Sequence, residues 1–171
     1  MKKFKLTSEF IVDISGVKLF RIKALIEFGN VKAGDLGGYI EKEENLSHMG
    51  NAWVSGNARV SSNARVSGDA QVFGDARVSG NAQVFGDARV SGDKDYAYAH
   101  GFGSCNRTTT FFRLKDGDVG VRCGCFYGTL AQFRDNVCET HGETKKAQEY
   151  LMLADLMELR FEEDENEVGN R

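Results

Sequence analysis

Apolar residues in the middle of the chain recur with a period of six. Valine occupies every sixth position, at Val54, Val60, Val66, Val72, Val78, Val84 and Val90. Alanine stands two positions before each of them, at Ala52, Ala58, Ala64, Ala70, Ala76, Ala82 and Ala88. Residues two apart on an extended segment face the same side. Each alanine–valine pair is therefore predicted to point into a core, and the mostly polar residues beside it to point outward.

Each repeat begins with a glycine followed by asparagine or aspartate, with Ser62 as the one exception to the glycine. These residue types best tolerate positive φ, so one repeat is predicted to form one short strand and one corner. A period of six does not match the 3.6-residue period of a helix, and the strands are too short for an antiparallel meander. Residues 50–94 are therefore predicted to form a coil in which each repeat pairs with the one three repeats later.

The unit G-[ND]-A-x-V-x resembles the hexapeptide-repeat family, whose members fold as left-handed parallel β-helices. The left hand is what the resemblance implies, because the period alone sets no hand. Seven repeats give a little more than two coils of three. Both open ends of so short a stack are sheet edges, so the flanking segments are expected to cap them.

Residues 1–49 are predicted to form the first cap. Two apolar runs flank Ser15-Gly16, which predicts a hairpin. Ile40, Leu46 and Ala52 are six apart, so the repeat is predicted to begin in degraded form before Gly50. The segment is similar to the leading part of bacterial and phage hexapeptide-repeat proteins, some of them assigned as transferases. The similarity is carried by Phe28, Val31, Lys32, Gly34, Gly37, Gly38 and the EKEENLS run at 41–47.

Residues 95–161 are predicted to form a ββαα module. Two strands flank a turn at residues 115–118. Thr129 begins a capping box and a helix that ends before Gly142, a typical stop. A second helix is predicted from Thr144 to about Phe161, and the acidic residues 162–171 are predicted to be a disordered tail.

The C-terminal part also resembles a module of bacterial and phage proteins, and the resemblance carries no known activity. The matching residues are Gly103, Ser104, Asn106, Thr108 to Phe112, Cys123 to Phe126, Gly128, Thr129, Phe133, Val137, His141 and Gly142. The fold class is thus mainly β: a short left-handed parallel β-helix with an N-terminal β cap and a C-terminal ββαα module.

Composition and charge limit the expected partners and cellular location of the protein. The net charge is −3, which indicates neither nucleic acid nor an anionic membrane as a partner. No apolar stretch approaches the ~20 residues of a membrane span, and the N-terminus is not that of a secretory signal. A cytoplasmic location is therefore expected, with the cysteines as free thiols.

Metal and histidine chemistry are both disfavoured. Cys123, Cys125, Cys138 and His141 are zinc-ligand types, but the C-x-C…C-x₂-H spacing is unusual. Structural packing is the favoured interpretation, so no metal or other cofactor is predicted. Acyltransferases of the resembling family use a histidine base between subunits. The repeats here contain no histidine, and His48 and His100 flank them.

The run GFGSCNRTTTFFR at residues 101–113 is the preferred ligand-binding candidate. It combines glycines, hydroxyls and arginines, which together can cradle phosphate. The candidate residues are Ser104, Asn106, Arg107, Thr108, Thr110 and Arg113. The competing interpretation is an ordinary polar strand whose threonines face solvent.

The outward arginines of the repeat offer a second anion-binding possibility. Arg59 and Arg77 are predicted to stack one coil apart on one face, whereas Arg65 pairs with Gln83 and Gln71 with Arg89. Such a row can hold a polyanion, but aspartates interleave with it and the local net charge is zero. A solvated face is therefore favoured over nucleic-acid binding.

Phe73 and Phe85 stand where most repeats have an outward serine. Exposed aromatic side chains need a cover, which either a cap of the same chain or a neighbouring chain can provide. A homo-oligomer is favoured, and the resemblance implies a trimer. The predicted function is non-catalytic binding or scaffolding in a phage-related context. The partner is a host protein, such as a defence factor, or a small anionic ligand, such as a nucleotide signal. The alternative is a hexapeptide-repeat acyltransferase.

Overall fold

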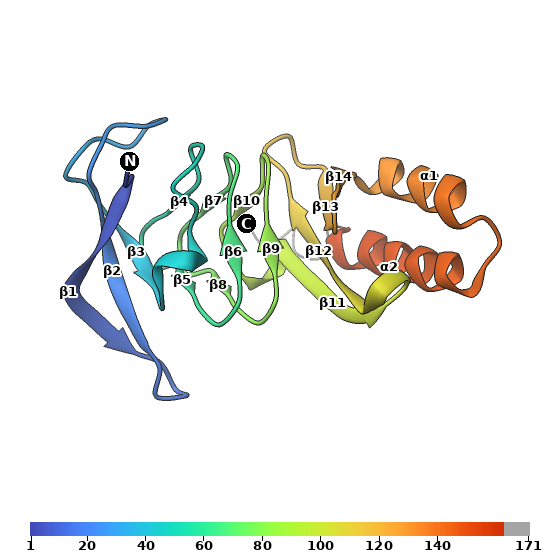
Figure 1. Ribbon diagram of the computed structural model, residues 1–171, viewed down its shortest axis with the longest axis horizontal. Coiled ribbons are helices and arrows are strands. Elements are labelled where there is room, and N and C mark those ends of the chain that lie inside the picture. The colour runs from blue at the N-terminus through green and yellow to red at the C-terminus, as the bar shows by residue number, and fades with distance from the viewer. Residues whose placement is uncertain (163–171) are drawn as a thin grey trace, which may run out of the picture.

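The computed structural model describes residues 1–162. An N-terminal hairpin, a stack of very short strands and a C-terminal sheet with two helices follow one another in a row (Figure 1). The predicted acidic tail lies outside the described residues from position 163 onward.

The N-terminal part is a hairpin that adds a third strand. β1 (Phe4–Val12) pairs antiparallel with β2 (Lys18–Ala24), and β2 pairs antiparallel with β3 (Leu36–Ile40). Asp13 forms the turn, since its Oδ1 accepts the backbone N–H groups of Ser15 and Val17 at 2.8 and 2.9 Å. The predicted hairpin is confirmed. A short 3₁₀ helix, η1 (Glu43–Asn45), follows β3.

The repeat forms two-residue strands that stack in parallel. They are β4 (Trp53–Val54), β5 (Arg59–Val60), β6 (Arg65–Val66), β7 (Gln71–Val72), β8 (Arg77–Val78), β9 (Gln83–Val84) and β10 (Arg89–Val90). Pairing joins β4, β7 and β10 in one row, β3, β5 and β8 in a second, and β6 and β9 in a third. Each repeat therefore pairs with the one three repeats later, as predicted.

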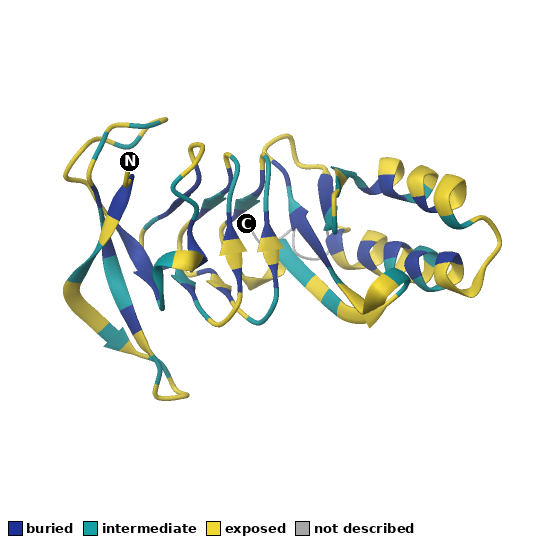
Figure 2. Cartoon of the chain, viewed as in Figure 1, coloured by how far each residue is buried: buried dark blue, intermediate teal, exposed yellow. Residues whose placement is uncertain are grey.

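The core of the stack consists of the predicted alanines and valines. Every one of these side chains is 1% exposed or less, and the polar residues between them lie outside (Figure 2). The corners need positive φ: Gly56 has a φ of 63°, and Ser62, the one non-glycine at this position, adopts 58°. A Cβ on Gly68 would lie 2.8 Å from the backbone nitrogen of Gly86, so stacked corners also exclude larger residues.

The leading edge of the repeat corrects one prediction. Ile40 pairs with Val60 and Leu46 with Val66, so both occupy the valine position. Val54 follows Leu46 by eight residues, because two extra residues interrupt the repeat. A degraded repeat does precede Gly50, but placing Ala52 in the same series was wrong.

The C-terminal part is a four-stranded antiparallel sheet followed by two helices. The strands are β11 (Tyr96–Phe102), β12 (Arg107–Arg113), β13 (Val119–Cys123) and β14 (Phe126–Thr129), in that order. The 3₁₀ turns η2 (Asp93–Asp95) and η3 (Ser104–Asn106) flank β11. The prediction of two strands was incomplete: β12 and β13 were expected, and β11 and β14 were missed.

Both helices were predicted correctly. α1 (Leu130–His141) begins with the capping box of Thr129 and Gln132 and ends at Gly142, which has a φ of 57°. α2 (Lys145–Phe161) begins at Thr144, whose hydroxyl accepts the N–H of Ala147.

The C-terminal sheet joins two cores. Phe112 and Leu114 pack with the alanines and valines of the stack. Phe111, on the opposite face of β12, packs with Phe133 of α1 and Ala154 of α2. The sheet therefore closes one end of the stack and carries the helices on its other side (Figure 1).

Outside the strand ladders, the hydrogen bonds between coils run in one direction. The N–H groups of Trp53, Arg59 and Arg65 donate to carbonyls seventeen residues later, at 2.9–3.0 Å. The last coil is therefore left with unpaired N–H groups, and side-chain acceptors satisfy them. Thr110 Oγ1 accepts from Gln83 at 2.9 Å, and Asp95 accepts from Ser91 at 2.8 Å.

The first coil is left with unpaired carbonyl groups, which need donors. Lys3 Nζ donates to Gly50 and Ala52 at 3.3 and 2.8 Å. Asn45 Nδ2 donates to Ser62 and Ala64 at 3.1 and 2.9 Å. Each end of the stack is thus capped by side chains of the polarity that its backbone requires.

The cap at Thr110 gives a direct test. Thr110→Val keeps the shape of the side chain but leaves the N–H of Gln83 without its acceptor. We expect the free energy of unfolding to fall by about 1–3 kcal/mol in urea denaturation. Thr108→Val, on the same strand but partly exposed, is the control and should change it by less than about 0.5 kcal/mol. Equal effects would contradict the capping role.

Candidate functional site

A cavity of about 430 Å³ lies where the ends of β12 and β13 meet the two helices. We call it the C-terminal cavity. It is lined by Ser104, Arg107, Cys123, Cys125, Phe126, Phe133, Asn136, Val137, Thr140, His141 and Tyr150. The lining combines one guanidinium and several hydrogen-bonding side chains with an aromatic wall.

Tyr150 organises this cavity. Its hydroxyl oxygen accepts the N–H of Ser104 at 2.8 Å, and its ring lies 5.7 Å from that of Phe133 and 5.6 Å from that of His141. Burial raises the pKa of Tyr150, because removing water disfavours the charged form. A Cβ on Gly103 would overlap the Tyr150 ring, which explains why glycine precedes the η3 turn.

The η3 turn has an unusual backbone. Cys105 and Asn106 have φ values of 59° and 48°, and Gly103 has 70°. Positive φ in adjacent non-glycine residues is costly and often marks functional sites. A hydrogen bond with Ser104, and then the positive charge of Arg107, lower the pKa of the exposed Cys105 thiol.

Arg107 supplies the positive charge at the cavity. Its side chain is exposed and lies against the β13–β14 turn, where a Cβ on Gly124 would overlap its Nη1 atom. The absence of a side chain on Gly124 therefore leaves room for the guanidinium. In this position Arg107 can form paired hydrogen bonds with a carboxylate or phosphate.

The six predicted ligand residues do not all converge. Ser104 and Arg107 line the cavity, and Asn106 belongs to the adjoining turn. Thr108 faces the opposite side of β12, where its hydroxyl lies 2.8 Å from His100 Nδ1.

The other two predicted residues have structural contacts elsewhere. Thr110 is buried and caps the repeat stack. Arg113 donates hydrogen bonds at 3.0 Å to the carbonyls of Gly117 and Phe161. The strand alternates its faces, so a contiguous polar run cannot form one site.

The cysteine–histidine cluster falls partly in the same cavity. Cys123, Cys125 and His141 line it, whereas Cys138 is exposed on α1 outside it. In the part of the chain that the structure describes, no three His, Cys, Asp or Glu residues gather closely enough to hold a metal. The lack of a bound metal remains a prediction. Asn136, Thr140 and Tyr150 were not predicted to contribute to a binding site.

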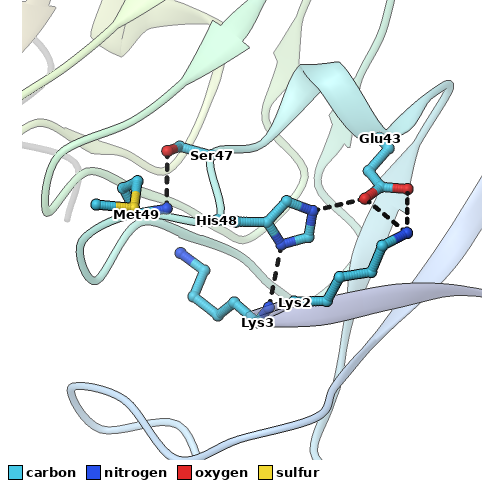
Figure 3. A network of polar contacts seen from close by, with 6 residues as sticks. All are labelled: Lys2, Lys3, Glu43, Ser47, His48 and Met49. Carbon is cyan, nitrogen blue, oxygen red and sulfur yellow. Dashed lines mark hydrogen bonds and ion pairs between the residues drawn. The ribbon is translucent and has the colours of Figure 1, made fainter.

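A second polar cluster surrounds His48, one of the two extra residues before β4 (Figure 3). Its Nδ1 accepts the backbone N–H of Lys3 at 3.1 Å, so Nε2 carries the proton in the neutral ring. Nε2 lies 2.7 Å from Glu43, whose other oxygen bonds Lys2 at 3.2 Å. Hydrogen bonds with His48 and Lys2 lower the pKa of Glu43. Both nitrogens of His48 are therefore engaged, and neither is available as a general base.

Lys3 is buried beside this cluster. Its ammonium caps two carbonyls of the stack and lies 4.6 Å from the centre of the Phe28 ring. Burial lowers the pKa of Lys3 to about 8, because removing water disfavours the charged form.

The two outward phenylalanines differ in environment. Phe85 is half-buried, with the Tyr127 ring centre 5.0 Å away and the Arg122 guanidinium 4.4 Å from its centroid. Phe73 is 38% exposed. Phe85 is thus covered by side chains of the same chain, which is one of the two possibilities that the sequence left open. Phe73 remains on the surface.

Comparison with known proteins identifies the repeat. A family model described as YdcK Beta solenoid repeat matches residues 52–68, 70–84 and 82–93. The periodic segment is thus a β-solenoid repeat, and the match spans nearly all of it. No curated protein matches the chain. No helix within residues 1–162 is long and apolar enough to cross a membrane.

The pKa of Lys3 predicts a pH dependence. Between its folded value of about 8 and its usual value of 10.5, the unfolded chain binds more protons than the folded one. The contribution of Lys3 to stability therefore rises with pH over this window.

We expect the unfolding free energy of the wild type, minus that of Lys3→Met, to increase by about 2 kcal/mol from about pH 7 to pH 9.5. The exposed Lys5, two residues later on β1, gives the control Lys5→Met, for which this difference should stay constant. A constant difference for Lys3→Met would contradict burial of the ammonium.

Proposed function

We propose that this protein is a non-catalytic binding protein whose C-terminal cavity takes a small anionic ligand. The observation that carries the proposal is the meeting of Arg107 with Ser104, Asn136 and Thr140 along an aromatic wall. A guanidinium and neutral donors recognise an anionic group, while the apolar wall suits the remainder of a small molecule.

A nucleotide has both of these parts. Its phosphate would bind Arg107, and its base would pack near Phe126 at the half-exposed edge of the aromatic wall. This chemistry agrees with the phage-related role that the sequence resemblance suggests, in which a nucleotide defence signal or a host protein is captured in the cytoplasm.

The alternative of a hexapeptide-repeat acyltransferase has less support. That chemistry needs a histidine base, and the repeats contain none. His48 has both nitrogens in hydrogen-bonding contacts, and His100 Nδ1 pairs with Thr108.

We further propose that the repeat stack is a closed, left-handed β-helix of the hexapeptide type and that the protein assembles as a trimer. The eighteen-residue pairing interval and the small alanine–valine core support the first proposal. The exposed Phe73 supports the second, together with a surface ridge of α2 made of Met152, Leu156 and Leu159.

Ligand binding at the cavity can be tested by thermal shift with mono-, di- and cyclic nucleotides and with acetyl-CoA. We expect at least one nucleotide to raise the Tm, since a ligand at a hundred times its Kd adds about 2.7 kcal/mol. Arg107→Gln should weaken its binding about tenfold or more. Arg160→Gln, an exposed arginine at the far end of α2, is the matched control.

Two results would argue against the proposal. If Arg107→Gln bound every stabilising nucleotide as tightly as the wild type does, the cavity would not be the site. Stabilisation by acetyl-CoA with transfer of its acetyl group would instead favour the acyltransferase.

The assembly can be tested by light scattering. A trimer predicts a mass near three times the 18.9 kDa of one chain. Phe73→Ser should shift the mass toward 18.9 kDa if this residue lies at the interface. Phe85→Ser, which alters a side chain covered within the chain, should instead lower the Tm without changing the mass. A monomeric wild type at micromolar concentration would contradict the trimer.

A further inference from the structure

A second cavity of about 430 Å³ lies over β5 and β8, away from the C-terminal cavity. We call it the arginine groove and define it by Ser15, Arg59, Ser61, Arg77 and Tyr98. The turn of the N-terminal hairpin forms one wall, the solenoid forms the floor, and Tyr98 of β11 forms the other wall. All three parts of the chain therefore contribute to it.

Two like charges face this groove from adjacent strands. Arg59 and Arg77 are direct partners in the parallel pairing of β5 and β8, so their backbones lie ~4.8 Å apart. The other two solenoid rows place glutamine next to arginine, as in the pairing of Arg65 with Gln83. Like charges directly opposite each other are destabilising, and only the row of β5 and β8 places two arginines opposite each other.

Neither guanidinium is paired with a carboxylate of residues 1–162. Across residues 1–162, Arg59 and Arg77 form no side-chain hydrogen bond or ion pair. The neighbouring carboxylates are bound to backbone N–H groups instead: Asp13 to Ser15 and Val17, and Asp93 to Arg77. Glu41 likewise accepts the N–H of Ser62 at 2.5 Å.

The carboxylate of Asp13 and several uncharged groups complete the groove. Ser15, Ser61 and Tyr98 bring hydroxyl groups to its walls, and Ile14 and Val17 of the hairpin turn bring apolar surface. Tyr98 is held against the corner at Gly80, where a Cβ would overlap its hydroxyl oxygen. The groove thus combines two guanidinium groups that have no ion-pair partner within residues 1–162 with one carboxylate, hydroxyl donors and an aromatic wall.

We propose that the arginine groove binds a small phosphate monoester. A phosphate monoester carries nearly two negative charges at neutral pH and three terminal oxygens. It can therefore engage two guanidinium groups and a hydroxyl at once, whereas a carboxylate has only two oxygens. The organic part of the ester would lie between the apolar residues of the hairpin turn and Tyr98. This site is independent of the proposed C-terminal cavity.

Isothermal titration calorimetry tests the proposal, with Arg107→Gln as the parent protein so that the C-terminal cavity does not contribute. The probes are ribose 5-phosphate, adenosine 5′-monophosphate, inorganic phosphate, ribose and succinate, in ~100 mM NaCl to screen nonspecific attraction. We expect saturable binding of the two esters and none of ribose. Adding Arg59→Gln or Arg77→Gln should weaken ester binding about tenfold or more.

The solenoid supplies its own controls. Glutamine already stands at the equivalent positions 71 and 83, so these substitutions suit the fold. Arg65→Gln changes the same charge on another row and should leave ester binding unchanged. Without ligand, Arg77→Gln should keep or raise the Tm, because it removes a like-charge contact. A fall of several degrees would show that the arginines stabilise the fold instead.

The remaining outcomes are equally decisive. No saturable binding of either ester, or unchanged binding after both arginine substitutions, would overturn the proposal. Equal binding of succinate would overturn selectivity for phosphate. Equal binding of inorganic phosphate would overturn the assignment to an ester. None of these results bears on the C-terminal cavity, which is tested through Arg107 itself.

Discussion

The structure depends on the prevailing direction of the hydrogen bonds between coils. Outside the strand ladders, each coil donates its N–H groups to the carbonyls of the next, so the two ends of the stack differ in the groups they leave unpaired. The N-terminal end exposes acceptors and is closed by donors from Lys3 and Asn45. The C-terminal end exposes donors and is closed by acceptors such as Thr110 and Asp95. The hairpin and the sheet therefore have different capping roles and are not interchangeable.

The capping of the two ends determines which polar side chains remain available for ligand binding. A buried N–H group without a partner costs about as much as a lost hydrogen bond. The hydroxyl of Thr110 is therefore needed to cap the stack and is not available to a ligand. Arg107 lies on the other face of the same strand, beyond the solenoid, and is exposed. Arg59 and Arg77 lie outside the solenoid wall, where the backbone is already paired. The residues available to ligands are those that the hydrogen-bond pattern does not use.

Periodicity predicted the solenoid well because one physical rule, small apolar residues inside and glycine corners outside, repeats at every position. It predicted the edges less well. The extra residues His48 and Met49 shift the register, and no period reveals an insertion until the pairing is seen. β11 was missed because it alternates aromatic residues with alanines and is mostly half-exposed or exposed. The sequence predicted only part of the candidate site. Ser104 and Arg107 are close together in the sequence and were predicted, whereas Tyr150 contacts Ser104 from a helix more than forty residues later and was missed.

The pairing interval also limits how such a chain can change in length. Adding one six-residue repeat would move every later strand to the next row and turn the C-terminal sheet about a third of the way around the axis. Adding a whole coil of three repeats would preserve all rows and only separate the hairpin from the sheet by ~4.8 Å. Related chains that keep the arginine groove between Ser15 and Tyr98 should therefore share one repeat number. Chains that gain or lose coils would be expected to keep the C-terminal cavity and lose the groove.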